Sequence, residues 1–321
     1  AVLVASWISI AFQLVQIIFA APTGISALAS PTANLVGKWN DFGLFIGLTT
    51  ALVLIAISAI TLSRISTLVL YITLAASLFL LAVINFSISW VLVALTAFLV
   101  LVFSLVRLQL SDNNDDGHGS GAGAIFASIA LLIVSLSFLT FGSTFSAPLQ
   151  TFFGVESFEV RPSLEGTRLI AESVYQKDPF FGSGPNTFSS DWLLYRSSDI
   201  IATPFWNVPF NAGAGLIPTA FVTGGLTVGI SWCLFIILFL YTSFRALFLN
   251  VNLRNPSSIL SILSASGVLF LIIAHVVYVP STNLTLLMFI FTGLFLASLQ
   301  GTSQVSTRVI TFSRDPRLGF V

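Results

Sequence analysis

Charged residues are scarce in this sequence. Asp, Glu, Lys and Arg make up 7% of its 321 residues, whereas a soluble domain carries about 25%. This scarcity excludes an ordinary soluble domain. The 12 basic residues are balanced by 12 acidic ones, so no positive excess favours a nucleic-acid partner.

Cysteine and histidine are nearly absent. The one cysteine, Cys233, excludes a disulfide within the chain, and its apolar surroundings indicate a small core residue. The two histidines are His118 and His275. The first residues lack the basic start of a signal peptide, so we interpret 2–20 as a membrane span rather than a leader.

Apolar residues are abundant instead, at 56% of the chain. Several apolar runs reach the roughly 20 residues that a helix needs to cross a bilayer, and a lone apolar segment satisfies its backbone in lipid only as a helix. The sequence therefore predicts an all-α, polytopic membrane protein with about eight spans. The predicted spans are 2–20, 42–62, 67–86, 90–107, 123–146, 224–248, 258–278 and 281–299.

Positive charges in the short connections predict the orientation, because Lys and Arg are enriched on the cytoplasmic side. One face receives Arg64, Arg107, Arg245, Arg254, Arg308, Arg314 and Arg317. We expect that face to be cytoplasmic, with a linker 108–122 and a tail 300–321 on it. The segment 147–210 then lies outside, within an extracytoplasmic loop 147–223.

The cytoplasmic linker contains the opening of a calcium-binding loop. Asp112, Asn114, Asp116 and Gly117 fit that pattern, but Gly123 replaces the bidentate glutamate at the twelfth position. We therefore interpret this stretch as a solvated linker, on which His118 is exposed.

The extracytoplasmic loop opens with a helix signal. Ser163 can cap a helix, and the pair Asp178-Pro179 can stop one. Apolar residues recur between them at helical spacing. We predict an amphipathic helix over 163–177 that lies on the outer membrane surface.

A glycine-rich stretch, FFGSGPNTF, follows at 180–188. Gly182 and Gly184 let the backbone approach a ligand, and the peptide N–H groups before Asn186 can form an anion-binding concavity. The same residues are typical of any tight turn, so both interpretations stay open.

Arginines and aromatic rings flank this stretch. Arg161 and Arg168 can present planar guanidinium groups to a phosphate, although Arg161 can also simply pair with Glu159 or Glu165. The rings of Trp192 and Trp206, with those of Tyr195 and Phe205, can stack on sugars or anchor the loop at the interface. Together these features suit a lipid whose headgroup contains a phosphate and a sugar.

The order of these motifs resembles the bacterial O-antigen ligase and O-antigen polymerase family of polytopic membrane proteins. Matching features are Arg161, the following helix, KDPFFGSGPNTF, and a later span that opens with Gly225 and Gly229. The resemblance covers about residues 159–230. It implies transfer of a glycan from an undecaprenyl-diphosphate carrier to a lipid or glycan acceptor at the outer face of the cytoplasmic membrane, with no metal or other cofactor. Arg161 would hold the diphosphate leaving group.

One departure from the family concerns the base that activates the acceptor. The family has a loop histidine about eleven residues before the glycine of the next span, and this loop has none. Asn207 and Asn211 are the nearest polar residues, and can orient a hydroxyl. Asp191 is our first candidate base. His275, near the outer end of its span, is a second candidate, or else a neutral histidine bonded between helices.

Two other classes of function remain open at this stage. A transporter or flippase-like carrier would show repeats and paired charges near the midplane, and the predicted spans carry no Asp, Glu, Lys or Arg at their centres. A non-catalytic membrane scaffold is the other alternative.

Overall fold

The computed structural model describes residues 2–19, 30–60, 62–110, 118–155, 160–249 and 255–301. Regular structure within these ranges is helical. The elements are α1 (Val2–Phe19), α2 (Trp39–Ala59), α3 (Arg64–Ile84), α4 (Ser87–Leu110), α5 (His118–Phe153), α6 (Leu164–Tyr175), α7 (Phe188–Tyr195), the 3-10 helix η2 (Ser198–Ala202), α8 (Leu216–Leu249), α9 (Pro256–Val277) and α10 (Thr282–Gly301).

Seven helices of the described ranges are long and apolar enough to cross a membrane: α2, α3, α4, α5, α8, α9 and α10. The prediction of an all-α, polytopic membrane protein is therefore confirmed. The remaining predicted span, 2–20, corresponds to α1, an apolar helix of 18 residues, which is near the short end of the roughly 17–25 residues that a crossing requires.

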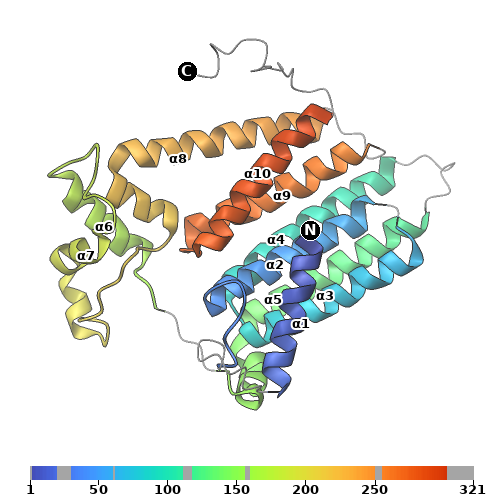
Figure 1. Cartoon of the computed structure of the whole chain (residues 1–321), viewed down its shortest axis with the longest axis horizontal. Helices are drawn as coiled ribbons and strands as arrows, with labels where there is room; N and C mark the ends of the chain where they lie inside the picture. Colours follow the sequence, from blue (N-terminus) through green and yellow to red (C-terminus); the bar gives the residue numbers. More distant parts are fainter. Residues whose placement is uncertain are drawn as a thin grey trace, which may run out of the picture.

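The helix α2 lies inside a bundle, where it contacts α3, α4, α5 and α9 (Figure 1). Its side chains are buried almost throughout, and Phe42, Leu44 and Ile46 are completely covered. The helix α8 lies at the edge of the bundle and packs on α9. Apolar side chains such as Ile230 and Leu234 stay exposed on it, as expected of a surface that faces lipid.

Two helices, α5 and α8, extend furthest beyond their predicted spans. The helix α5 continues past residue 146 to Phe153, because hydrogen bonds hold the extension against the end of α3. The amide of Asn85 donates to the hydroxyl of Ser146, and the amide of Gln150 donates to the carbonyl of Val83. Local apolarity does not reveal such contacts between helices.

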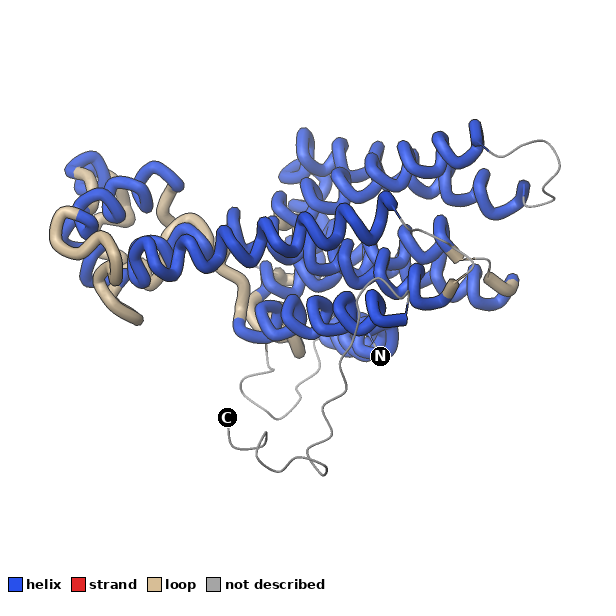
Figure 2. The backbone as a smooth tube through the Cα atoms, turned by 90° about the horizontal axis from the view of Figure 1, so that it is seen from above, coloured by secondary structure: helices blue, strands red, loops and turns tan. Residues whose placement is uncertain are grey.

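The helix α8 begins at Leu216 instead of 224 and is broken at Gly225, where φ is 64° and ψ is −163°. Its first part, before the break, packs with α6 and α7. We call residues 160–224 the loop unit. Figure 2 shows the loop unit at one end of the helical bundle.

The predicted helix 163–177 is present as α6, and Ser163 caps it by accepting a hydrogen bond from the N–H of Gly166. We expected its apolar face to lie on the membrane surface, but that face packs within the protein. Ile170 and Val174 are buried against Trp192 of α7 and Val222 of α8. The apolar periodicity was sufficient to predict the helix, but not which partner would cover its face.

Part of the predicted linker and tail lies outside the described residues. This applies to 111–117, which includes Asp112, Asn114, Asp116 and Gly117 of the calcium-like pattern, and to 302–321.

Candidate functional site

Arg161 lies where the loop unit meets the bundle. Its guanidinium carbon is 5.2 Å from the centre of the Tyr278 ring, a distance typical of a cation–π contact. The Nη1 atom of Arg161 is buried and has no hydrogen-bond partner among the described residues. Glu165, one possible partner suggested by the sequence, pairs with Arg168 instead. The Nη1 atom of Arg161 is therefore a desolvated donor without an acceptor in the part of the chain that the structure describes.

Two hydrogen bonds and one close backbone approach hold the segment that contains Arg161 beside Tyr278. The hydroxyl of Thr167, in the first turn of α6, accepts a hydrogen bond from the N–H of Ala214. Two residues later, the N–H of Leu216 donates to the carbonyl of Tyr278 at 2.9 Å. At Gly215, a Cβ atom would lie 2.1 Å from the carbonyl oxygen of Val276, so only glycine permits this approach. The start of α6 is thereby fixed beside the end of α9.

Lys38 lies on the same tyrosine ring, with its ammonium nitrogen 5.9 Å from the ring centre. The segment before α2 is held to the start of α10. The amide of Asn283 donates to the carbonyl of Val36, and the carboxylate of Asp41 accepts from the N–H groups of Lys38 and Ser281. Our sequence reasoning did not include Lys38 in the site. The one sequence feature that could have identified it is its position directly before a span, on the predicted extracytoplasmic face, where the short connections carry few cations.

We call Lys38, Arg161 and Tyr278 the junction cluster. Tyr278 is 1% exposed, and Phe86 packs edge-on against it at 5.1 Å. Lys38 is exposed to solvent, whereas the Nη1 atom of Arg161 is buried. Phosphate oxygens are suitable acceptors for a guanidinium group, and an anion bound there would also be attracted by the charge of Lys38.

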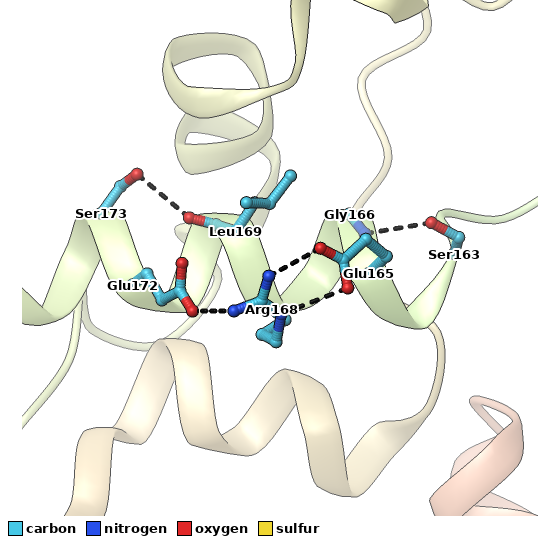
Figure 3. A network of polar contacts seen from close by, with 7 residues as sticks. All are labelled: Ser163, Glu165, Gly166, Arg168, Leu169, Glu172 and Ser173. Atoms are coloured by element: carbon cyan, nitrogen blue, oxygen red, sulfur yellow. Dashed lines mark hydrogen bonds and ion pairs between the residues drawn. The ribbon is translucent and has the colours of Figure 1, made fainter.

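Arg168 is not part of this cluster. It forms ion pairs with Glu165, at 2.7 Å, and with Glu172 on the exposed side of α6 (Figure 3). These bonds raise the pKa of Arg168, and the Arg168 guanidinium lowers the pKa of Glu165. With both carboxylates bound to it, Arg168 is poorly suited to hold a phosphate.

The glycine-rich stretch forms backbone hydrogen bonds with the residues at the break in α8. The N–H groups of Ser183 and Gly184 donate to the carbonyls of Val222 and Thr223, which the break leaves without helical partners. In return, the N–H of Leu226 donates to the carbonyl of Pro179. The amides that we considered for an anion concavity are therefore used within the protein.

Positive φ angles make this interlock possible. They occur at Gly182, Gly184 and Asn186, at 67°, 101° and 62°. Among them Gly182 is the most constrained, since a Cβ there would lie 2.3 Å from the carbonyl oxygen of Val222. The stretch is thus a structural turn, which was one of the two sequence interpretations.

The predicted sugar-binding residues fall into two groups. Trp192 is buried in the loop unit and packs edge-on against Phe210, so it presents no open ring face. Trp206, Asn207 and Asn211 are exposed and remain available to a ligand. The carbonyl of Trp206 accepts a hydrogen bond from Arg196.

Asp191 lies in the first turn of α7 and is 7% exposed. Its Oδ2 atom is buried without a hydrogen-bond partner among the residues that the structure describes. Lys177 is nearby, and its pKa is raised mainly by a hydrogen bond to Tyr195, with a smaller contribution from the Asp191 carboxylate. The Oδ2 atom of Asp191 and the Nη1 atom of Arg161 therefore do not bond to each other.

His275 connects two helices. Its Nδ1 lies 2.6 Å from the carbonyl of Leu271 and its Nε2 lies 3.0 Å from the hydroxyl of Thr285 in α10. A carbonyl only accepts, so Nδ1 carries a proton, and in a neutral ring Nε2 would accept from the hydroxyl of Thr285. The bonds of both ring nitrogens agree with a histidine bonded between helices, the second of the two interpretations given above.

We expect the pair His275 and Thr285 to be coupled in stability. A double-mutant cycle with His275→Phe and Thr285→Val should give a coupling free energy of about 0.5–1.5 kcal/mol, as for a buried hydrogen bond. Reversible unfolding of the variants in detergent micelles measures it. Additive effects of the two substitutions would mean that this hydrogen bond contributes nothing to stability.

The fold defines the class of the protein, a polytopic, all-helical membrane protein with a helical loop unit at one end of the bundle. In the described parts of the chain, no three His, Cys, Asp or Glu side chains come together as a metal site would require. Comparisons with protein-family models, with curated proteins and with solved structures found no match.

Proposed function

We propose that the protein transfers a glycan from an undecaprenyl-diphosphate carrier to a lipid or glycan acceptor at the outer face of the bacterial cytoplasmic membrane. The observation that carries the proposal is the buried Nη1 of Arg161, which has no hydrogen-bond partner in the described part of the chain and lies on the same ring as a second cation, Lys38. A diphosphate would supply acceptor oxygens for that Nη1 and negative charge beside both cations. The resemblance of residues 159–230 to O-antigen ligases and polymerases supplies the carrier and the glycan.

In the proposed reaction, a hydroxyl oxygen of the acceptor attacks the anomeric carbon of the sugar attached to the carrier. A new glycosidic bond forms while the bond from that carbon to the diphosphate oxygen breaks. The electron pair of the broken bond stays on undecaprenyl diphosphate, and the hydroxyl proton passes to a base. Arg161 and Lys38 would stabilise the negative charge that grows on the leaving group, because preorganised cations need no reorganisation as the charge develops.

Asp191 remains our candidate for the base, since its buried Oδ2 has no partner among the described residues. His275 is less suited to this role, because both of its ring nitrogens are engaged within the protein. Trp206, Asn207 and Asn211 are exposed on the same loop unit and would contact the glycan or its acceptor.

Reconstituted transfer tests this function. The full chain in lipid vesicles would receive a purified undecaprenyl-diphosphate glycan and a candidate acceptor, with formation of the glycosylated acceptor followed by mass spectrometry. The matched control is the same glycan on undecaprenyl monophosphate. We expect product from the diphosphate and far less from the monophosphate. Equal product from both carriers would contradict a site built for a diphosphate.

We also expect the loop unit to face the outside of the cell. In a Cys233→Ser background, Ser190→Cys in α7 should react with a membrane-impermeant maleimide added to intact bacterial cells. Ser66→Cys in α3 should react only after the cells are permeabilised, because it lies among the arginine-rich connections. Both residues are exposed. The reverse labelling pattern would place the proposed site on the cytoplasmic side.

A further inference from the structure

Two phenylalanines project from the loop unit beside the break in α8. Phe180 is 61% exposed and Phe181 is 69% exposed. Exposing apolar rings of this size to water is unfavourable. Two such rings side by side therefore indicate that another apolar group covers them.

The backbone that carries these rings is held on both sides. The N–H groups of Phe180 and Phe181 donate to the carboxylate of Asp178, at 3.1 and 3.0 Å. The carbonyl of Phe180 accepts from the N–H and the hydroxyl of Thr227, at 3.1 and 2.8 Å. The two rings are therefore presented by an ordered turn, and not by a loose loop.

These bonds also set the level of the rings along α8. Thr227 lies just after the break in α8, in the part of that helix that spans the membrane. The next residues on its uncovered side, Val228 and Ile230, are apolar and exposed. The phenylalanine pair therefore adjoins the lipid-facing surface of α8 at the end where the loop unit begins.

We propose that Phe180 and Phe181 insert into the bilayer and contact the acyl chains of the leaflet that borders the loop unit. The occupant is bilayer lipid, because the pair continues an apolar surface that lipid already covers on α8. Moving an apolar phenylalanine ring from water into the acyl-chain region is favourable. The proposal also assigns a membrane contact to the loop unit in place of α6, whose apolar face is covered by α7 and α8.

Insertion of Phe180 and Phe181 into the bilayer would hold the proposed site at a fixed height relative to the lipid headgroups. The loop unit joins the bundle through few contacts, among them Arg161 with Tyr278 and Leu216 with Tyr278. A second attachment through the phenylalanine pair would restrain the unit at the level of the lipid headgroups. This inference depends on the membrane-spanning fold and not on glycan transfer, so either can fail alone.

Spin-label accessibility in nanodiscs tests the proposal. In a Cys233→Ser background, a nitroxide would be attached at Phe181→Cys and, separately, at Phe180→Cys. The measurement compares collisions with oxygen, which concentrates in lipid, and with a water-soluble nickel complex. Matched controls are Ile230→Cys on the lipid-facing side of α8 and Ser198→Cys on an exposed part of the loop unit.

We expect the oxygen-to-nickel ratio at 181 and 180 to match the ratio at 230 and to exceed the ratio at 198. A ratio like that at 198 would place the pair in water and overturn the proposal. Protection from both reagents would also overturn it, because a second copy of the chain would then cover the rings. Both side chains project outward, so the cysteine variants keep the backbone bonds to Asp178 and Thr227.

Discussion

Replacement of Arg161 by alanine should lower glycan transfer by at least about 100-fold, the effect of removing one preorganised charge-stabilising group from an active site. The fold should persist, because within the described residues Arg161 makes one cation–π contact, worth about 0.5–2 kcal/mol, and its Nη1 has no hydrogen-bond partner there. Arg161→Lys should recover little of the activity, since an ammonium group cannot form the planar fork of a guanidinium. Initial rates in reconstituted vesicles measure both variants.

Arg168→Ala is the matched comparison, because it removes an arginine from the same helical segment that is already paired with Glu165 and Glu172. It should transfer glycan at close to the wild-type rate. Normal transfer by Arg161→Ala, combined with loss of transfer in Arg168→Ala, would move the site from the junction cluster to the exposed face of α6.

Gly182→Ala should destabilise the protein by about 2–5 kcal/mol, the sum of a left-handed backbone and an overpacked contact. Its φ is 67°, and a Cβ atom would lie 2.3 Å from the carbonyl oxygen of Val222 and 2.6 Å from the backbone nitrogen of Gly225. The interlock between the glycine-rich stretch and the break in α8 would have to open. Thermal unfolding in detergent, followed by tryptophan fluorescence, measures the loss.

Gly154→Ala separates the two costs. Gly154 also has a positive φ, of 62°, but a Cβ atom there meets nothing within 4 Å. The free energy of unfolding of this variant should fall only by the cost of a left-handed backbone at alanine, about 1–2 kcal/mol. An equal loss in both variants would mean that the contact between Gly182 and Val222 contributes nothing.

The spans and the helix α6 could be predicted because their signals are local. A run of apolar residues specifies a membrane helix whatever its neighbours are. Ser163 announces the start of α6 through its own side chain. The break at Gly225 was not predictable in this way, because its unpaired carbonyls are satisfied by Ser183 and Gly184, about forty residues earlier in the chain.

The candidate site illustrates the same limit. Arg161 could be selected from its place before a helix and next to a family-like motif. Lys38 could not, since its position over Tyr278 depends on Asp41 and Asn283 holding the start of α2 against the start of α10. No pattern near Lys38 encodes that contact. The ion pairs of Arg168 were, by contrast, encoded locally, because Glu165 and Glu172 lie three and four residues from it on the predicted helix. Our sequence analysis did not use that spacing to separate Arg168 from Arg161.

The central claim, that Arg161 and Lys38 hold a lipid-linked diphosphate, is tested most directly by mass spectrometry of the lipids that co-purify with the protein. Wild-type protein, Arg161→Ala and Lys38→Ala would be extracted from the same bacterial membranes with mild detergent. We expect an undecaprenyl-diphosphate glycan with the wild-type protein and a strong reduction of that lipid in both variants. Equal amounts in all three preparations, or its absence from the wild-type protein when the carrier is abundant in the membrane, would contradict the account.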